Sequence, residues 1–176
     1  MTLTVVIHNI RSVHNVGSIF RTADATGVLK IYLCGITPAP YDRLGNLRKD
    51  FAKVALGAEK YCAWESVKST ARAISALKKD GWKIFAVEQS KNSVPYFKLK
   101  SAAAGENKKF KVALILGDEV RGLPPRILKC ADKVLEIPMR GAMVRDAHHP
   151  KRVGVGKESL NVAVAFGIVV FRLLHS

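Results

Sequence analysis

The stretch Leu3–Cys34, LTVVIHNIRSVHNVGSIFRTADATGVLKIYLC, decides the fold class because its hydrophobic period changes twice. Leu3–Ile7 is rich in β-branched residues and predicts a strand, and Ile31–Cys34 predicts another. Between them the apolar residues recur at helical spacing over Asn15–Ala25, with Asn15 as a candidate cap and Gly27 just past the end. A strand, a helix and a strand in this order predict parallel strands in an α/β fold.

The rest of the chain repeats this alternation. A turn-rich loop follows to about residue 61, and residues 91–109 form a second polar connection. The remaining predicted elements are a helix over Ser66–Lys79, strands over Lys83–Val87, Val112–Leu116 and Val134–Ile137, a short helix ending at Cys130 and a final helix from Ser159. Short apolar strands alternating with helices predict a mostly parallel sheet with helices on both faces, in one domain.

The composition excludes several classes of protein. The chain has 176 residues, 48% of them hydrophobic, which is enough for a packed core and excludes a disordered chain. Lys and Arg number 29 against 14 Asp and Glu, giving a net charge of +15. Such an excess indicates a polyanionic partner, although solubility alone is the simpler alternative. The most apolar stretch, Leu160–Leu174, is shorter than the roughly 20 residues of a membrane span.

Cysteines and common motifs narrow the choice further. Cys34, Cys62 and Cys130 are an odd, widely spaced set, which fits free thiols in a reducing cytoplasm. No Cys/His cluster has zinc spacing, so we expect no metal site. The sequence has neither a GxSxG nucleophile motif nor a GxGxxG dinucleotide motif, and Lys157 is followed by Glu158 where a phosphate loop needs Ser or Thr.

Three segments carry chemistry. In the first, Asn9, Arg11, Asn15 and Arg21 surround a predicted helix N-terminus, a natural place for a phosphate. Gly17 lies one turn before Arg21, which would leave space for a ligand beside a fixed cation. The alternative is an ordinary helix cap with a solvated arginine.

The second and third segments also lie where predicted strands end. ALILGDEVRGLP, Ala113–Pro124, places Glu119 and Arg121 in a turn after Gly117, which lets the backbone approach closely. EIPMRG and the later ESLNVAVAFG bring another strand end to a helix start, where Ser159 can cap and Asn161 can bond within the first turn.

In residues and order, the three segments resemble the SpoU family of RNA 2′-O-ribose methyltransferases, within the SPOUT superfamily, over Val5–Phe171. The resemblance implies a C-terminal trefoil knot, S-adenosylmethionine as cofactor and no metal. It implies catalytic roles for Arg21 and Asn15, with Glu119 and Asn161 as supports for the site. Implied cofactor contacts are Val87, Glu88, Gly117, Ile137, Met139, Ser159 and Leu160.

Two roles are open for Arg21. Family proposals make this arginine a base for the ribose hydroxyl. Because an arginine side chain has a pKa above about 12, we favour instead a role in orienting the hydroxyl and stabilising developing negative charge.

RNA contacts are expected from Asn9, Arg11 and Arg121, and from a basic insert at about residues 142–158 that is longer than in small relatives. The insert carries Arg145, Lys151 and Arg152. It is either an RNA-contacting arm, a lid over the cofactor or a solvated loop. Small family members without an added RNA-binding domain often act on tRNA, so the resemblance favours tRNA over rRNA.

The final helix is apolar on two opposite faces. One face can meet the sheet, and the other then needs a second chain, which predicts a homodimer. The family resemblance implies that the active site forms across the dimer interface. The alternative is a helix buried within one subunit. An enzyme is the leading hypothesis, and a non-catalytic, knotted RNA-binding or ribosome-assembly protein is the alternative.

Overall fold

The computed structural model describes residues 1–99, 110–118, 120–139 and 159–174. Within these residues the chain forms a seven-stranded parallel sheet of order β3-β2-β1-β6-β4-β7-β5. The strands are β1 (Thr2–His8), β2 (Lys30–Cys34), β3 (Trp64–Val67), β4 (Lys83–Val87), β5 (Val94–Pro95), β6 (Lys111–Leu116) and β7 (Lys133–Glu136). The predicted parallel α/β sheet is therefore confirmed.

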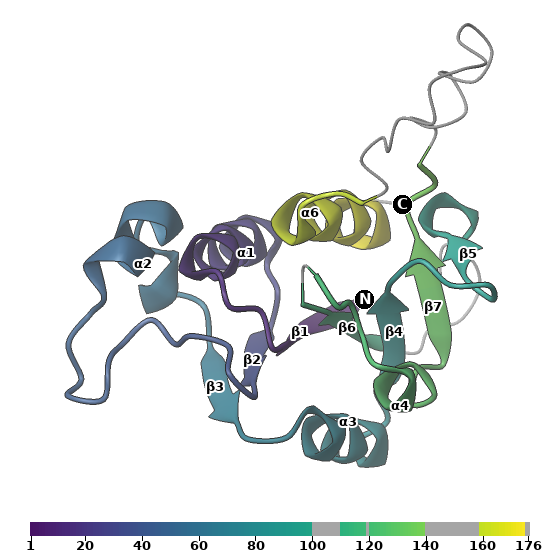
Figure 1. Cartoon of the computed structure of the whole chain (residues 1–176), viewed down its shortest axis with the longest axis horizontal. Helices are drawn as coiled ribbons and strands as arrows, with labels where there is room; N and C mark the ends of the chain where they lie inside the picture. The colour runs from purple at the N-terminus through teal and green to yellow at the C-terminus, as the bar shows by residue number, and fades with distance from the viewer. Residues whose placement is uncertain (100–109, 119, 140–158, 175–176) are drawn as a thin grey trace, which may run out of the picture.

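Helices cover both faces of the sheet (Figure 1). Their bounds are α1 (Val13–Thr26), α2 (Lys49–Ala55), α3 (Thr70–Lys79), α4 (Pro125–Leu128) and α6 (Val162–Leu174), with 3-10 turns at Ala58–Lys60 and Tyr96–Lys98. α1 contacts both α2 and α6 on one face, and α3 and α4 lie on the other. No helix among the described residues is long and apolar enough to cross a membrane.

The strands are apolar on both sides because both sides are covered. In β1, Val5 and Ile7 join the core beneath α1 and α6, whereas Val6 joins the core beneath α3 and α4. Successive side chains of a strand point to opposite faces, so a central strand between two helical layers reads as a continuous apolar run.

α1 begins two residues earlier than predicted. Ser12, not Asn15, is the cap: its hydroxyl accepts a hydrogen bond from the Asn15 N–H at 3.2 Å. Gly27 ends the helix in the left-handed conformation, as expected. The space expected beside Gly17 is absent, because a Cβ there would lie 3.1 Å from Cβ of Val54. Gly17 instead allows α2 to pack closely against α1.

Three elements were placed wrongly or missed. The predicted helix Ser66–Lys79 is strand β3 followed by α3, which Ser69 caps by accepting from the Arg72 N–H. α2 lies in the segment predicted as a loop, and β5 lies in the predicted polar connection.

The final helix begins at Val162, not at Ser159. Asn161 is its cap, because its Oδ1 accepts hydrogen bonds from the N–H groups of Ala163 (2.9 Å) and Val164 (3.4 Å). The insert at 142–158 lies outside the described residues. The chain between β7 and α6 includes residues 140–158, so the trefoil knot stays a prediction.

Candidate cofactor pocket and RNA-facing surface

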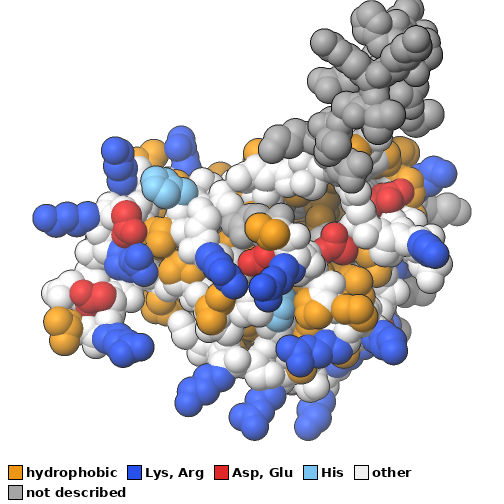
Figure 2. Space-filling view, in the orientation of Figure 1, with side chains coloured by type: hydrophobic (Ala, Val, Ile, Leu, Met, Phe, Trp, Pro, Cys, Tyr) orange, Lys and Arg blue, Asp and Glu red, His pale blue; other side chains and the backbone are white. Residues whose placement is uncertain are grey.

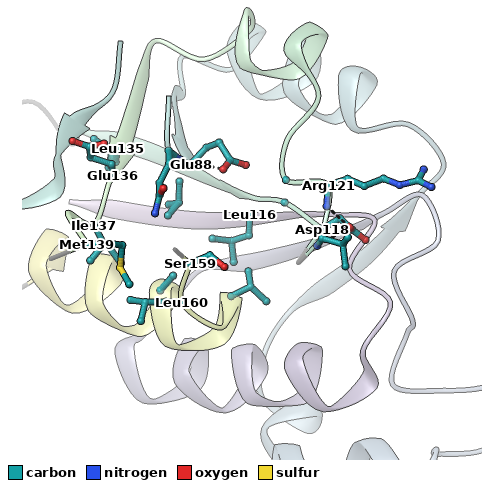
Figure 3. Close-up of a pocket in the computed structure, with 17 residues that line it drawn as sticks. Glu88, Leu116, Asp118, Arg121, Leu135, Glu136, Ile137, Met139, Ser159 and Leu160 are labelled. Carbon is teal, nitrogen blue, oxygen red and sulfur yellow. Dashed lines mark hydrogen bonds between the residues drawn. The ribbon is translucent and has the colours of Figure 1, made fainter. Parts of the chain in front are cut away.

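A pocket of about 370 Å³ lies at the carboxyl ends of β4, β6 and β7, under the start of α6 (Figure 3). Its size is within the range of small-molecule sites. Parallel strands all end at the same edge, so residues far apart in sequence meet there. All seven residues predicted to contact the cofactor line this pocket: Val87, Glu88, Gly117, Ile137, Met139, Ser159 and Leu160.

The pocket floor depends on two glycines in the turn that follows β6. A Cβ on Gly117 would lie 2.7 Å from the carbonyl carbon of Gly122 and 2.8 Å from the Leu123 nitrogen. Gly122 has φ +63°, and a Cβ there would lie only 2.3 Å from the Glu88 carboxylate. The close backbone approach predicted for Gly117 is thus a contact within the turn, between Gly117 and the backbone of Gly122 and Leu123.

Glu88 holds the turn against the end of β4. One carboxylate oxygen accepts a hydrogen bond from the Leu123 N–H at 2.7 Å, and the other accepts from the Gln89 N–H at 3.1 Å. The Glu88 side chain therefore both lines the pocket and fixes the opposite wall.

Asp118 organises the same turn from within. Its Oδ1 accepts hydrogen bonds from the N–H groups of Val120 (3.0 Å) and Arg121 (2.9 Å). These backbone bonds, with the nearby charges of Arg11 and Arg121, hold the pKa of the Asp118 carboxyl below its usual value. Glu119 lies outside the described residues, so its supporting role stays a prediction.

The pocket is acidic although the protein is strongly basic. Glu88, Asp118 and Glu136 line it, with Arg121 as the cation among its described lining residues. The Glu136 carboxylate accepts from the Ser93 hydroxyl at 2.7 Å. Figure 3 shows Arg121 at the far end of the turn with its guanidinium directed outward. A small, partly apolar ligand carrying positive charge fits such walls.

The first sequence segment lies beside the pocket rather than in it. Asn15 Oδ1 accepts a hydrogen bond from Asn161 Nδ2 at 2.9 Å, which joins α1 to the start of α6. Arg21 is exposed on α1 and is not one of the described residues that line the pocket. The structure thus brings Asn15 and Asn161 together and leaves Arg21 outside the pocket of its own chain.

Asn9 and Arg11 differ in their surroundings. Asn9 has φ 55°, its Oδ1 accepts from the Ile36 N–H at 3.2 Å, and its Nδ2 lies 3.1 Å from His8 Nε2. Its side chain is therefore occupied within the fold. Arg11 is exposed on the loop between β1 and α1. RNA contacts by Asn9 and Arg11 stay predictions.

Several lining residues were not predicted for the cofactor. Asp118, Glu136 and Gln89 directly follow or end the strands that supply the predicted contacts, so the same strand-end rule could have found them. Val162 and Ala165 come from the first turn of α6, whose start was placed too early. Among the described residues no cluster of three or more His, Cys, Asp or Glu could hold a metal ion.

Comparison with known proteins identifies the family of this chain. The family model described as "SpoU rRNA Methylase family" matches residues 2–145. The chain belongs to the SpoU family. The match stops inside the expected basic insert, whereas alignments with individual family members continue across nearly the whole chain.

Named relatives act on two kinds of RNA. A tRNA (guanosine(18)-2′-O)-methyltransferase of Aquifex aeolicus is 30% identical over 169 residues, covering 96% of this chain and 67% of that protein. The 23S rRNA (guanosine-2′-O-)-methyltransferase RlmB of Ralstonia nicotianae is 28% identical, covering 98% of this chain and 58% of its own length.

Among solved structures, an AdoMet-bound rRNA methyltransferase from Sinorhizobium meliloti has a TM-score of 0.76 and 25% identity, covering 98% of this chain and 55% of that one. The chain thus spans about three fifths of the length of most of these relatives. What they share with this chain is the SpoU domain.

Proposed function

We propose that this chain is an S-adenosylmethionine-dependent methyltransferase that acts on a ribose 2′-hydroxyl of RNA. The observation that carries the proposal is the pocket at the carboxyl edge of the sheet, lined by all seven residues that the SpoU resemblance implies for the cofactor. Family membership and relatives named as tRNA and rRNA 2′-O-methyltransferases support it.

The residues present fit the cofactor. S-adenosylmethionine carries a sulfonium and an ammonium group, and the carboxylates of Glu88, Asp118 and Glu136 offset such charges. Apolar walls suit its adenine ring, and they are supplied by Val87, Leu116, Leu135, Ile137, Met139 and Leu160. The cofactor supplies an electrophilic methyl group, so the protein needs mainly to align the ribose hydroxyl with it and to exclude water.

Arg21 is the residue we assign to the RNA side of the reaction. An arginine stays protonated at neutral pH, so it can hold the hydroxyl and an adjoining phosphate and stabilise negative charge that develops on the oxygen. We assign Asn15 to the same site, because its bond to Asn161 ties α1 to the wall of the pocket.

Arg21 lies outside the described lining of its own pocket, which supports assembly of the active site between two copies of the chain. α6 offers a surface for the second copy. Phe166, Val169 and Val170 are fully buried against the sheet, whereas Val164 and Phe171 are 51% and 49% exposed. A homodimer formed over this apolar face would cover it and bring the partner's α1 near the pocket.

Oligomeric state tests this arrangement. Val164→Glu places a charge on the exposed face of α6 and should convert a dimer to a monomer in sedimentation experiments, with loss of methyl transfer. Leu44→Glu, at a side chain that is 86% exposed on the loop before α2, is the matched control. A wild-type protein that sediments as a monomer and is fully active would refute the shared site.

The substrate is RNA, and we favour tRNA because the 30% identical Aquifex aeolicus relative is named as a tRNA methyltransferase. We place the protein in the cytoplasm, where its three free cysteines would stay reduced. We assign Arg145, Lys151 and Arg152 of the basic insert to RNA contact, and this assignment rests on sequence alone.

The deciding experiment transfers a labelled methyl group to separated cellular tRNA and rRNA, followed by nuclease mapping of the modified nucleoside. Arg21→Ala should lower the rate by about 10²–10³-fold, the usual cost of a lost charge-stabilising donor, while cofactor binding stays intact. Arg43→Ala, another exposed arginine, should be active. A protein that binds RNA but no S-adenosylmethionine in calorimetry would instead be a non-catalytic RNA-binding relative.

A further inference from the structure

Three arginines from separate segments stand at the carboxyl edge next to the pocket. Arg11 follows β1, Arg121 lies in the turn after β6, and Arg126 lies in α4, and all three are exposed. Among the described residues, the ion pairs join Lys30 with Glu65 and Arg48 with Asp50, so none of the three guanidinium groups is in one. They are available for an external anion.

These cations lie near two groups at the carboxyl edge: Arg126 acts on the buried His8 at the end of β1, and Arg11 and Arg121 act on Asp118. His8 Nδ1 lies 2.7 Å from the hydroxyl of Thr70, the first residue of α3. Burial lowers the pKa of His8, and the charge of Arg126 lowers it further, whereas Asp118 acts in the opposite direction. Arg126, Asp118 and the start of α3 are therefore neighbours at the end of β1.

A basic surface continues from this point over α3 and α4. The two helices pack on the same sheet face through one core cluster that includes Ile74 and Ile127. Figure 2 shows Lys and Arg side chains along the lower rim, where α3 and α4 lie in Figure 1. We define the α3–α4 surface by its exposed basic residues Lys68, Arg72, Lys78, Lys79, Arg126 and Lys129.

The few acidic groups near this surface do not neutralise it. Asp80 ends α3, and the Oδ2 of Asp132 accepts a hydrogen bond from the Ile84 N–H at 2.7 Å. The surface therefore has a strong excess of positive charge.

The other basic region, around α2, has a different character. Its cations alternate with acidic residues, and Arg48 pairs with Asp50 at 3.2 Å. It also exposes aromatic rings, including Tyr61 at 79%. Single-stranded RNA is held by bases stacked on such rings, whereas a double helix is held through its phosphates. α3 and α4 contain no aromatic residue, which favours phosphate contacts.

We propose that the backbone of a double-helical RNA segment crosses from Arg11 and Arg121, beside the pocket, over Arg126 onto the α3–α4 surface. The target ribose then lies at the pocket, and the adjoining stem lies along α3, which is about 15 Å long. This inference rests on the proposed methyltransferase function, and it adds which face of the sheet carries the RNA and which form of RNA it fits.

The test is a charge reversal with a matched control. The triple variant Arg72→Glu, Arg126→Glu, Lys129→Glu alters the α3–α4 surface, and Arg43→Glu, Lys49→Glu, Lys53→Glu makes the same change in net charge around α2. The probes are an unmodified tRNA transcript and oligouridylate, titrated at several salt concentrations. Melting temperature and calorimetry with S-adenosylmethionine verify that each variant is folded.

The α3–α4 variant should bind the tRNA transcript at least about tenfold more weakly, and its log–log salt slope should fall by about 2–3. Its affinity for S-adenosylmethionine should be unchanged, and the α2 variant should keep most of its tRNA affinity.

Equal loss in both triple variants, or equal loss for tRNA and oligouridylate, overturns the assigned face or the preference for a stem. Unchanged tRNA affinity in the α3–α4 variant overturns the proposal while wild-type methyl transfer stands. If the wild type neither binds S-adenosylmethionine nor methylates RNA, the proposed function itself fails.

Discussion

The two halves of the sheet's carboxyl edge are built from similar residues and differ in outcome. Beyond β4, β6 and β7 the edge opens into the pocket, and we call this the open half. The described lining of the pocket includes no residue from the loops that follow β1 and β2, and we call that part of the edge the closed half. Both halves have a glycine whose missing side chain leaves room for a polar group, Gly35 for Asn9 and Gly122 for Glu88.

At the closed half, the side chains of His8, Asn9 and Thr37 all form hydrogen bonds within the fold. A Cβ on Gly35 would lie 2.0 Å from Asn9 Oδ1, which accepts from the Ile36 N–H. The Thr37 hydroxyl donates to carbonyl oxygens of the strand ends, and His8 bonds Thr70. At the open half, Glu88, Asp118 and Glu136 bond the fold and still line a cavity. A ligand-binding site requires polar side chains that can still bond a ligand after they have made their hydrogen bonds within the fold.

The largest effect is expected from Gly117→Ala in the open half. The new methyl group would meet backbone atoms of Gly122 and Leu123, which cannot move without displacing the turn. We expect a loss of about 3 kcal/mol of stability, at the upper end of overpacking costs, and cofactor binding at least about tenfold weaker. Denaturant unfolding and calorimetry measure the two, and full cofactor affinity would contradict the role of the turn.

Gly35→Ala, in the closed half, should cost stability but no cofactor affinity. Its φ of +68° strains any side chain by about 1–2 kcal/mol, and displacing Asn9 costs roughly one hydrogen bond more. Gly27→Ala is the matched control, because Gly27 has the same φ and no atom within 4 Å of the new Cβ. Denaturant unfolding should give a lower free energy of unfolding for Gly35→Ala than for Gly27→Ala. Equal losses would show that the Asn9 side chain moves aside without loss of stability.

Glu88→Gln separates the hydrogen bonds of Glu88 from its negative charge. The amide oxygen can still accept from the Leu123 N–H, but the amide nitrogen cannot accept from the Gln89 N–H, so stability should fall by about 1 kcal/mol, the cost of one hydrogen bond. Loss of the negative charge should weaken binding of the positively charged cofactor about fivefold. Glu65→Gln, in an exposed pair with Lys30, is the control and should leave binding unchanged in calorimetry. An unchanged affinity in Glu88→Gln would mean that its charge does not reach the cofactor.

The smallest effect concerns pH and His8. Because the folded protein holds the pKa of His8 below 6.5, the unfolded chain binds the proton more readily. The contribution of His8 to stability therefore falls as the pH drops below 6.5. His8→Gln should flatten that part of the stability–pH curve, measured by denaturant unfolding at a series of pH values. Parallel stability–pH curves for wild type and His8→Gln would contradict this role of His8.

The sequence predicts the central strands and α1 well because both sides of the sheet are buried and α1 has a clear apolar face. It misses β3 because Trp64–Val67 is an edge strand with an exposed middle, Glu65 and Ser66, which looks like the start of the following helix. α2 has one fully buried aromatic, Phe51, and no side-chain cap, so seven residues give too weak a pattern.

The family resemblance supplied the seven expected cofactor contacts, and they lie together because strand ends in a parallel sheet share an edge. The sequence alone could not show which polar side chains bond within the fold and which stay available for a ligand. Asn9 and Arg11 look alike as RNA contacts in a sequence, yet the neighbours of Asn9 come from residues near Ile36. Likewise the start of α6 depends on whether Ser159 or Asn161 bonds the first turn, and both residue types are good caps.

The position of β1 has a consequence for synthesis. Its Thr4 pairs with Lys30, but its other edge pairs from Thr2 opposite Lys111. While the chain is being made, one edge of β1 therefore has no partner strand until β6 has been translated. Such long-range pairing folds slowly and exposes a strand to other chains. A nascent protein of this topology should depend on chaperones most strongly between the translation of β2 and β6.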